Sequence, residues 1–493
     1  RCHSRRVQFT PFYNHEGYFM DHYVQDVLRD DLYFPDGQIL EEVYVYGSFI
    51  QSKMYHENVR CTDCHNPHSL ELKFTGNQLC NQCHAPAQYD TEKHHFHPMT
   101  TESSECVSCH MRGRFYMVND FRRDHSFRIP RPHLSIDSNN PNACNDCHTD
   151  QSPQWAAKWV DKWYPEKDSL LHYTELLTMA SKRNPADIPV ISKMVKDERH
   201  PAIARATAVY YLSQMANPLA NQTIVQALRD PHPHVRYQAA TSLVQMEQGE
   251  RKRLLTPLLR DSIRSVRIAA ASGLTDIPIE SFNPANQEVL KQALTAYEAG
   301  LAVRADFPGG QMEKAQFFER TGQAHLAEKS YLKAVELDTF FTPARLNLAH
   351  LYHREGNNQK AINLFKSIIE LEPDYGQAYY SLGLLYAEEK QLPSAIEYLE
   401  KAIDKMEESE RAYYNLGLAH QQINAIDEAE KTFLNGLEAY PASPDMMYAL
   451  SVLYIQNNRK KEARPWVDKL TELFPQSPQI QQLQQLVNQD NVQ

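Results

Sequence analysis

No apolar run in the sequence is long enough to cross a bilayer, which takes about 20 consecutive and mostly apolar residues, and the mean hydropathy is -0.60. A basic surplus is also missing, because the formal net charge at pH 7 is -11. Nucleic-acid binding depends on a surplus of Lys and Arg against phosphate. The sequence therefore excludes a transmembrane segment and argues against a nucleic-acid partner.

Cysteine is absent after residue 147, although the chain runs to residue 493. All nine cysteines lie before residue 150, together with 14 of the 22 histidines. The chain therefore divides into an N-terminal third rich in Cys and His and a long remainder in which redox-active residue types are sparse. Cofactor chemistry is expected in the N-terminal third.

Four copies of the pattern Cys-x-x-Cys-His occupy residues 61–65, 80–84, 106–110 and 144–148. Two cysteines at this spacing can form thioethers with the two vinyl groups of one haem, and the histidine that follows can bind the iron as proximal ligand. The pattern therefore predicts four complete sites for covalently attached haem c.

The sequence begins Arg1-Cys2-His3, which has the form of the end of a fifth such motif. We therefore expect a truncated fifth haem site, a chain that is processed or truncated, and further haems upstream of residue 1. The predicted thioether residues are Cys2, Cys61, Cys64, Cys80, Cys83, Cys106, Cys109, Cys144 and Cys147. The predicted proximal ligands are His3, His65, His84, His110 and His148.

Zinc binding and disulfide formation are the alternatives for these cysteines. The spacing of Cys61, Cys64, Cys80 and Cys83 also satisfies a zinc ribbon. A ribbon does not require a histidine directly after each cysteine pair, yet one follows in all four complete motifs. Nine cysteines are an odd number and cannot all pair as disulfides within one chain. Haem attachment is therefore the favoured interpretation.

The sixth ligand of each iron is expected to be a second histidine, because bis-His ligation is typical of low-potential electron carriers and a Met ligand would raise the potential. His68 cannot share an iron with His65 and would reach a neighbouring haem, and the cluster at 94–97 would supply two ligands to two haems. The distal candidates are His15, His68, His94, His95, His97 and His125. His22, His56 and His133 rank below these.

Six arginines lie between residues 112 and 131. They could form a patch for an anionic substrate or a nucleic acid. Each haem, however, carries two propionates, and the guanidinium fork suits carboxylates. We expect these arginines to pair with haem propionates.

Two periods follow the Cys-rich segment. A period of 31 relates Arg205, Arg236 and Arg267, with Asp230 and Asp261 opening two of the turns, and it is typical of HEAT-type helix pairs. A period of 34 relates leucines, aromatics and alanines, as in tetratricopeptide (TPR) repeats. The positions with this period are Leu348, Leu382, Leu416 and Leu450, and Ala361, Ala395, Ala429 and Ala463.

These patterns predict a mostly α fold, in which a loop-rich multihaem cytochrome c domain precedes an α-solenoid. The expected boundaries are 1–165 for the haem domain, 166–283 for the HEAT-like repeats and 284–493 for the TPR solenoid. The N-terminal third is too polar for an ordinary apolar core, so covalently bound porphyrins would supply the missing apolar volume.

The segments CTDCHNPHS, CNQCH, HHFH, CVSCHM, RRDHSFRIPRP and PNACNDCH, in this order, resemble a family of bacterial multihaem c-type cytochromes with C-terminal TPR repeats. The resemblance covers essentially the whole chain. It implies an octahaem-type protein whose first three motifs lie upstream, so that this chain holds the second half of the fourth motif and the fifth to eighth motifs complete.

The leading hypothesis is a carrier that passes single electrons along a chain of bis-His haems, without a substrate site of its own. The solenoid would dock redox partner proteins, or further copies of the chain in an extracellular filament. Covalent haem attachment takes place on the export side of the membrane, so we expect a periplasmic or cell-surface location in a bacterium.

The alternative hypothesis is a multihaem reductase or dehydrogenase that acts on a small nitrogen or sulfur compound. It requires one iron with an open position, which some multihaem reductases mark with Lys in place of the motif histidine. All four complete motifs keep the histidine. A third hypothesis, an adaptor whose haems only staple the fold, ranks below both.

Overall fold

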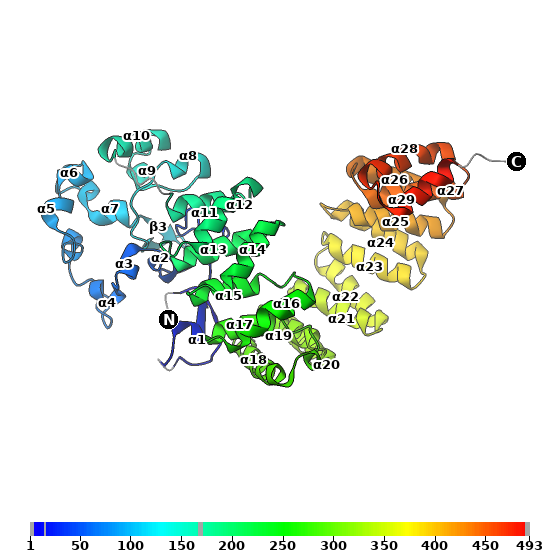
Figure 1. The fold of residues 1–493 in the computed structure, drawn as a ribbon, viewed down its shortest axis with the longest axis horizontal. Coiled ribbons are helices and arrows are strands. Elements are labelled where there is room, and N and C mark those ends of the chain that lie inside the picture. Colours follow the sequence, from blue (N-terminus) through cyan, green and yellow to red (C-terminus); the bar gives the residue numbers. More distant parts are fainter. Residues whose placement is uncertain (1–3, 14–15, 166–170, 489–493) are drawn as a thin grey trace. The chain divides into compact units, whose positions relative to one another are not determined.

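The computed structural model describes residues 4–13, 16–165 and 171–488 (Figure 1). Within these ranges the fold is mostly helical, with two short two-stranded sheets. The chain forms two compact units, residues 1–303 and residues 304–493. None of the described helices is both long and apolar enough to span a membrane.

The first segment of unit 1 packs against the helical repeats that follow much later in the sequence. Strands β1 (Arg6–Gln8) and β2 (Tyr23–Gln25) pair antiparallel. Leu28 and Tyr33 are buried in the same apolar core as the repeat helices, and the Leu28 N–H donates to Thr207 Oγ1 at 3.0 Å. The short helices here are α1 (Phe19–His22), α2 (Tyr46–Phe49) and α3 (Lys53–His56). The N-terminal third is therefore not uniformly coreless, because residues before about 50 share the core of the repeats.

Residues 53–103, all of them described, contain no buried residue. This stretch and the one after it consist of short helical turns and loops. The elements are α4 (Cys61–Cys64), η1 (Gly76–Leu79), α5 (Pro86–Tyr89), α6 (Glu92–His95), η2 (Glu102–Ser104), α7 (Cys106–His110), β3 (Gly113–Tyr116), β4 (Asp120–Arg123), α8 (Leu134–Ser138), α9 (Ala143–Cys147) and α10 (Pro153–Trp163). So polar a segment lacks the apolar volume that ordinarily holds a fold together.

The HEAT-type repeats are held together by an Arg–Asp ladder as well as by apolar packing. Arg205 forms an ion pair with Asp230, and Arg236 binds Asp261 through Nε at 2.7 Å, so the helix that carries each arginine contacts the turn that opens the next repeat. The helices are α11 (Tyr173–Ser181), η3 (Pro185–Asp187), α12 (Ile188–Lys196), α13 (Ala202–Leu212), α14 (Pro218–Ala227), α15 (Pro233–Thr241), α16 (Gln248–Leu255), η4 (Thr256–Arg260), α17 (Arg264–Ser272), η5 (Ile279–Ser281) and α18 (Pro284–Ala302).

Unit 2 is a stack of antiparallel helix pairs. The alanines with the 34-residue period, Ala361, Ala395, Ala429 and Ala463, are completely buried, because the two helices of each pair approach closely there. Gly417 shows how close the approach is, since a Cβ on it would lie 2.4 Å from the Phe433 ring. The helices are α19 (Pro308–Arg320), α20 (Ala324–Leu337), α21 (Thr342–Arg354), α22 (Asn358–Leu371), α23 (Gly376–Glu388), α24 (Leu392–Lys405), α25 (Glu410–Gln422), α26 (Ile426–Ala439), α27 (Pro444–Gln456), α28 (Lys460–Leu473) and α29 (Pro478–Asn488).

Candidate haem-binding region

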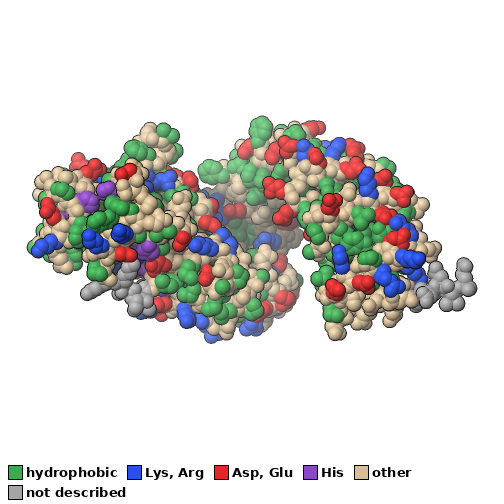
Figure 2. All heavy atoms as spheres, turned by 90° about the horizontal axis from the view of Figure 1, so that it is seen from above, with side chains coloured by type: hydrophobic (Ala, Val, Ile, Leu, Met, Phe, Trp, Pro, Cys, Tyr) green, Lys and Arg blue, Asp and Glu red, His purple; other side chains and the backbone are tan. Residues whose placement is uncertain are grey.

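Each Cys-x-x-Cys-His motif folds as one helical turn. The motif histidine donates its backbone N–H to the carbonyl of the first cysteine, at 2.9 Å in His65, 3.1 Å in His84 and 2.9 Å in His148. The eight described cysteines form no disulfide. Predicted site residues Cys2, His3 and His15 lie outside the described residues. Histidine side chains reach the surface on the side of unit 1 where the motifs lie (Figure 2, purple).

Three motif histidines face a second histidine. Ring centres of two histidines bound to opposite sides of one iron lie about 6.2 Å apart, because iron–nitrogen bonds are about 2.0 Å and the ring centre lies about 1.1 Å beyond each nitrogen. The observed pairs are His65 with His125 (6.4 Å, rings inclined by 25°), His94 with His110 (6.1 Å, 15°) and His97 with His148 (6.3 Å, 33°). All three separations fit one metal ion between the rings.

The second ring nitrogen of these histidines is also placed as metal ligands require. A ligating histidine usually donates its outer N–H to a carbonyl or hydroxyl, which orients the ring and leaves Nε2 for the metal. The Nδ1 atoms of His110, His125 and His97 lie 2.7, 2.9 and 2.5 Å from the carbonyl oxygens of Arg128, Arg123 and His95. Carbonyls only accept, so the hydrogen of each ring is on Nδ1.

The Nδ1 atoms of two further ligand candidates, His65 and His94, also lie near hydrogen-bonding oxygens. His65 Nδ1 lies 3.4 Å from the carbonyl of Leu70, and His94 Nδ1 lies 3.2 Å from the hydroxyl of Tyr164. That hydroxyl donates its own hydrogen to the His94 carbonyl. Burial is the main cause that lowers the pKa of His94, followed by the neighbouring His110, and both disfavour the charged ring.

His84 is placed differently. Among the described residues, the aromatic ring packed on it is that of Tyr89, edge-on at 5.7 Å, and Tyr89 in turn contacts His94 at 5.5 Å. Predicted ligands His68 and His95 pack on no motif histidine within the described part of the chain. His68 is exposed in the turn after the first motif, where its N–H donates to Asn66 Oδ1 at 2.9 Å.

Neighbouring motifs are in contact through their sulfurs. The side chains of Cys80 and Cys106 are neighbours, and their interaction lowers the pKa of Cys80 and raises that of Cys106. Asn77 fixes this contact, because its Oδ1 accepts the Cys106 N–H at 2.8 Å and its Nδ2 donates to Asp90 at 2.7 Å. Attachment points of the second and third motifs therefore adjoin.

The ring nitrogens of two lower-ranked histidines, His22 and His133, have hydrogen-bond partners within the protein. His22 has Thr10 Oγ1 3.0 Å from Nδ1 and the Glu16 carbonyl 3.0 Å from Nε2. His133 Nε2 lies 3.0 Å from Glu175 Oε1. These nitrogens are committed to hydrogen bonds, so the low rank of both residues agrees with their environment.

Four of the six arginines have partners within the protein. Arg112 binds Asp146 at 2.6 Å, Arg122 binds Asp120 and Glu42, and Arg123 donates to the Met111 carbonyl at 3.1 Å. Arg128, whose side chain is 15% exposed, donates to the Asp36 carbonyl at 2.9 Å and to Gln51 at 3.0 Å. These guanidinium groups thus already contact carboxylates and carbonyls of the chain, and their expected pairing with haem propionates stays a prediction.

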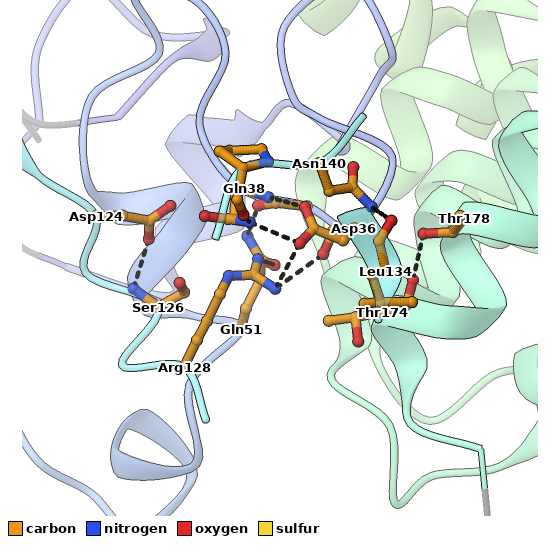
Figure 3. Close-up of polar contacts among 12 residues, drawn as sticks. Asp36, Gln38, Gln51, Asp124, Ser126, Arg128, Leu134, Asn140, Thr174 and Thr178 are labelled. Carbon is orange, nitrogen blue, oxygen red and sulfur yellow. Dashed lines mark hydrogen bonds and ion pairs between the residues drawn. The ribbon is translucent and has the colours of Figure 1, made fainter. Parts of the chain in front are cut away.

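Arg128 belongs to a polar network that sequence analysis missed (Figure 3). Gln38 donates to Asp36 at 2.7 Å, and Asp124 accepts the N–H of Ser126 at 2.8 Å, two residues before Arg128. The network borders a cleft of about 210 Å³ that reaches Cys109 and His110 from Arg128, Arg131 and His172. Arg112, Arg128 and Arg131 thus line this cleft beside His110.

Helix α10 covers the last motif with tryptophans. Trp155 packs on His148 at 4.8 Å, and Trp163 stacks on Phe96 at 4.5 Å with rings inclined by 1°. Trp155, Trp159 and Trp163 are spaced by four and so share one helical face. That spacing, directly after the last motif, was the sequence signal for this cover.

Family models match three parts of the chain. A doubled CXXCH motif covers residues 55–89, HEAT repeats cover 188–275, and tetratricopeptide repeats cover 346–410 and 414–478. The CXXCH model is of the haem-binding type, and TPR repeats are a protein-interaction fold. The predicted mostly α fold with HEAT and TPR repeats is confirmed.

Several solved TPR structures resemble parts of the chain. YrrB, "a TPR protein with an unusual peptide-binding site", has 21% identity and a TM-score of 0.31, over 36% of this chain and 93% of its own. MamA from Desulfovibrio magneticus RS-1 has 19% identity and 0.31, over 35% and 97%. Pseudomonas aeruginosa pilF has 18% and 0.33, over 46% and 98%. No curated protein matches the chain.

Proposed function

We propose that the chain is a multihaem c-type cytochrome that carries single electrons along bis-His haems. The observation that carries the proposal is the set of three histidine pairs with ring centres 6.1 to 6.4 Å apart, each containing one motif histidine. Haem supplies the one-electron chemistry, and the chain supplies ligation, orientation and burial.

The proposed ligation joins distant segments. His125 would be the distal ligand opposite His65, His94 opposite His110, and His97 opposite His148. Contacts between neighbouring motifs support a chain of close haems, since Cys80 touches Cys106 and Tyr89 bridges the rings of His84 and His94. His68, between the two motifs of the doubled CXXCH match, is the proposed distal ligand for the iron of the 80–84 motif.

Replacing distal ligands tests this proposal in the haem-loaded protein. The variants His125→Ala, His94→Ala and His97→Ala should each convert one low-spin haem to a high-spin haem that binds CO, seen in absorption and electron paramagnetic resonance spectra. His22→Ala and His133→Ala are matched controls and should leave every haem low-spin. If the three ligand variants also leave the spectra unchanged, the proposed ligation is wrong.

The variant His68→Ala distinguishes the electron-carrier proposal from the reductase alternative. The carrier proposal expects a new high-spin haem in this variant and none in the unchanged protein. A high-spin haem that binds nitrite or CO in the unchanged protein would instead favour the reductase, with the iron of the 80–84 motif as its open site.

We further propose that unit 2 docks a redox partner or a second copy of the chain, on the bacterial periplasmic or cell-surface side. Tyr380, Tyr414 and Tyr448 repeat with the 34-residue period, so successive first helices of the pairs present equivalent aromatics, and Tyr448 is 38% exposed. Residues 304–493 contain 19 Lys and Arg against 27 Asp and Glu, which favours a basic partner.

A further inference from the structure

In the 94–97 cluster, the ring hydrogen of His95 lies on the opposite ring nitrogen from that of His97. The backbone N–H of His97 donates to His95 Nδ1 at 3.2 Å. A nitrogen that accepts a hydrogen bond carries no hydrogen, so a neutral His95 has its hydrogen on Nε2. In His97 the hydrogen is on Nδ1, which faces the His95 carbonyl at 2.5 Å. His97 can therefore offer Nε2 to a metal, whereas Nε2 of His95 is an N–H donor.

Phe96 produces this arrangement. Helix α6 ends at His95, and Phe96 adopts a left-handed conformation with φ of 56°. The conformation is uncommon for a side chain of this size, and the stack of Phe96 on Trp163 at 4.5 Å holds it. The reversal turns both the backbone N–H and the ring of His97 back toward His95, so two hydrogen bonds link these residues.

His95 Nε2 is buried and has no hydrogen-bond partner in the described protein. Leaving a buried donor without an acceptor costs about 1–3 kcal/mol. The acidic side chains of the same segment are used elsewhere, since Asp90 accepts from Asn77 and Asn81, and Glu92 accepts the Met99 N–H. An acceptor from outside the polypeptide is therefore needed.

We infer that His95 does not bind iron and instead donates its Nε2–H to a haem propionate. This inference rests on the proposed function, because the acceptor belongs to a haem held by His94 or His97, the other histidines of the 94–97 cluster. A carboxylate satisfies the buried donor, and the same histidine orients the ligand His97 through its carbonyl and Nδ1. His95 thus acts as a positioning residue between two adjacent haems.

The test compares His95→Ala and His95→Gln with His94→Ala and His97→Ala in the haem-loaded chain. His95→Ala should keep every haem low-spin and lower the reduction potential of one haem, because an unpaired propionate charge stabilises the oxidised iron. His95→Gln keeps an N–H donor and should return that potential toward the original value. Spin states come from electron paramagnetic resonance, and potentials from a spectroelectrochemical titration.

Other outcomes would contradict either the role inferred for His95 or the proposed ligation. A new high-spin haem in His95→Ala would make His95 an iron ligand and overturn the inference, while the proposed function would stand. Unchanged potentials in His95→Ala would also overturn the inference, because they would show that His95 does not contact a propionate. Low-spin spectra in both His94→Ala and His97→Ala would instead count against the proposed ligation itself. Equal haem content in all variants shows that the chains have matured alike.

Discussion

Single residues beside the ligands set the properties of each proposed haem. A ligand histidine that donates Nδ1–H to a strong acceptor gains electron density and stabilises the oxidised iron. His110, His125 and His97 donate to carbonyls, whereas His94 faces the hydroxyl of Tyr164 at 3.2 Å. The proposed haem between His94 and His110 would therefore have one ligand whose hydrogen-bond acceptor can be removed without changing the backbone.

Tyr164→Phe should raise the reduction potential of that haem, because His94 Nδ1–H loses its acceptor and the ligand becomes a weaker donor. A spectroelectrochemical titration measures the shift. Tyr18→Phe is the control, since Tyr18 is 70% exposed and, among the described residues, contacts no proposed ligand ring. A lowered or unchanged potential in Tyr164→Phe would contradict the role assigned to this hydroxyl.

His234 should make the stability of unit 1 depend on pH. It is 4% exposed, and burial is the main cause that lowers its pKa to about 3. In the unfolded chain its pKa is about 6.5. Below pH 6.5 the unfolded state therefore binds the proton more readily, so stability falls as pH decreases toward 3, by about 1.4 kcal/mol per pH unit from this residue.

Chemical denaturation of unit 1 in the intact chain at several pH values between 7 and 4 measures this effect. His234→Gln should flatten the slope by the share of one histidine. His325→Gln, at an exposed position of unit 2, should leave the slope unchanged. Equal slopes in His234→Gln and the unchanged protein would show that His234 is accessible to protons in the folded state.

At the scale of elements, buried ion pairs hold successive HEAT-type helix pairs in position against one another. The side chains of Arg205 and Asp230 are 4% and 7% exposed, whereas the side chain of Arg199, paired with Asp197 on the surface, is 70% exposed. A buried charge left without its partner costs about 3–5 kcal/mol, whereas an exposed pair contributes about 0–1 kcal/mol.

Arg205→Ala should therefore destabilise unit 1 by about 3–5 kcal/mol, because Asp230 remains buried and unpaired. Arg199→Ala should change stability by less than about 1 kcal/mol. Urea denaturation followed by far-UV circular dichroism compares the two variants. Similar losses in both would mean that the ladder contributes no more than a surface ion pair.

Local elements were predictable where a period or a fixed spacing encodes them. Alanines 34 residues apart predicted the close helix contacts of unit 2. The Cys-x-x-Cys-His spacing located the motifs but did not predict that each folds as a helical turn. The side-chain partners of the arginines were not predictable in the same way. Asp36 and Gln51 reach Arg128 across 92 and 77 positions of sequence, and nothing periodic relates them.

At the scale of the whole molecule, long-range contacts decide what sequence alone leaves open. The cluster at 94–97 indicated two ligands for two haems, and the structure brings His94 to His110 and His97 to His148. The partner of His65 is His125, 60 positions away, which only the folded hairpin β3–β4 brings near. Likewise, residues before about 50 looked too polar for a core, yet they complete the core of repeats that begin more than 100 residues later.

The stretch from 53 to 103 without buried residues has a consequence for maturation. The repeats and the N-terminal segment have a core of their own, so they can fold before the cofactors arrive. Residues 53–103 have none, and they would close only as each porphyrin is attached and supplies apolar surface. Molecules that miss a haem would keep an open, protease-accessible loop beside a finished scaffold. Under the proposed function, proteases would therefore degrade chains that lack a haem and leave fully loaded chains intact.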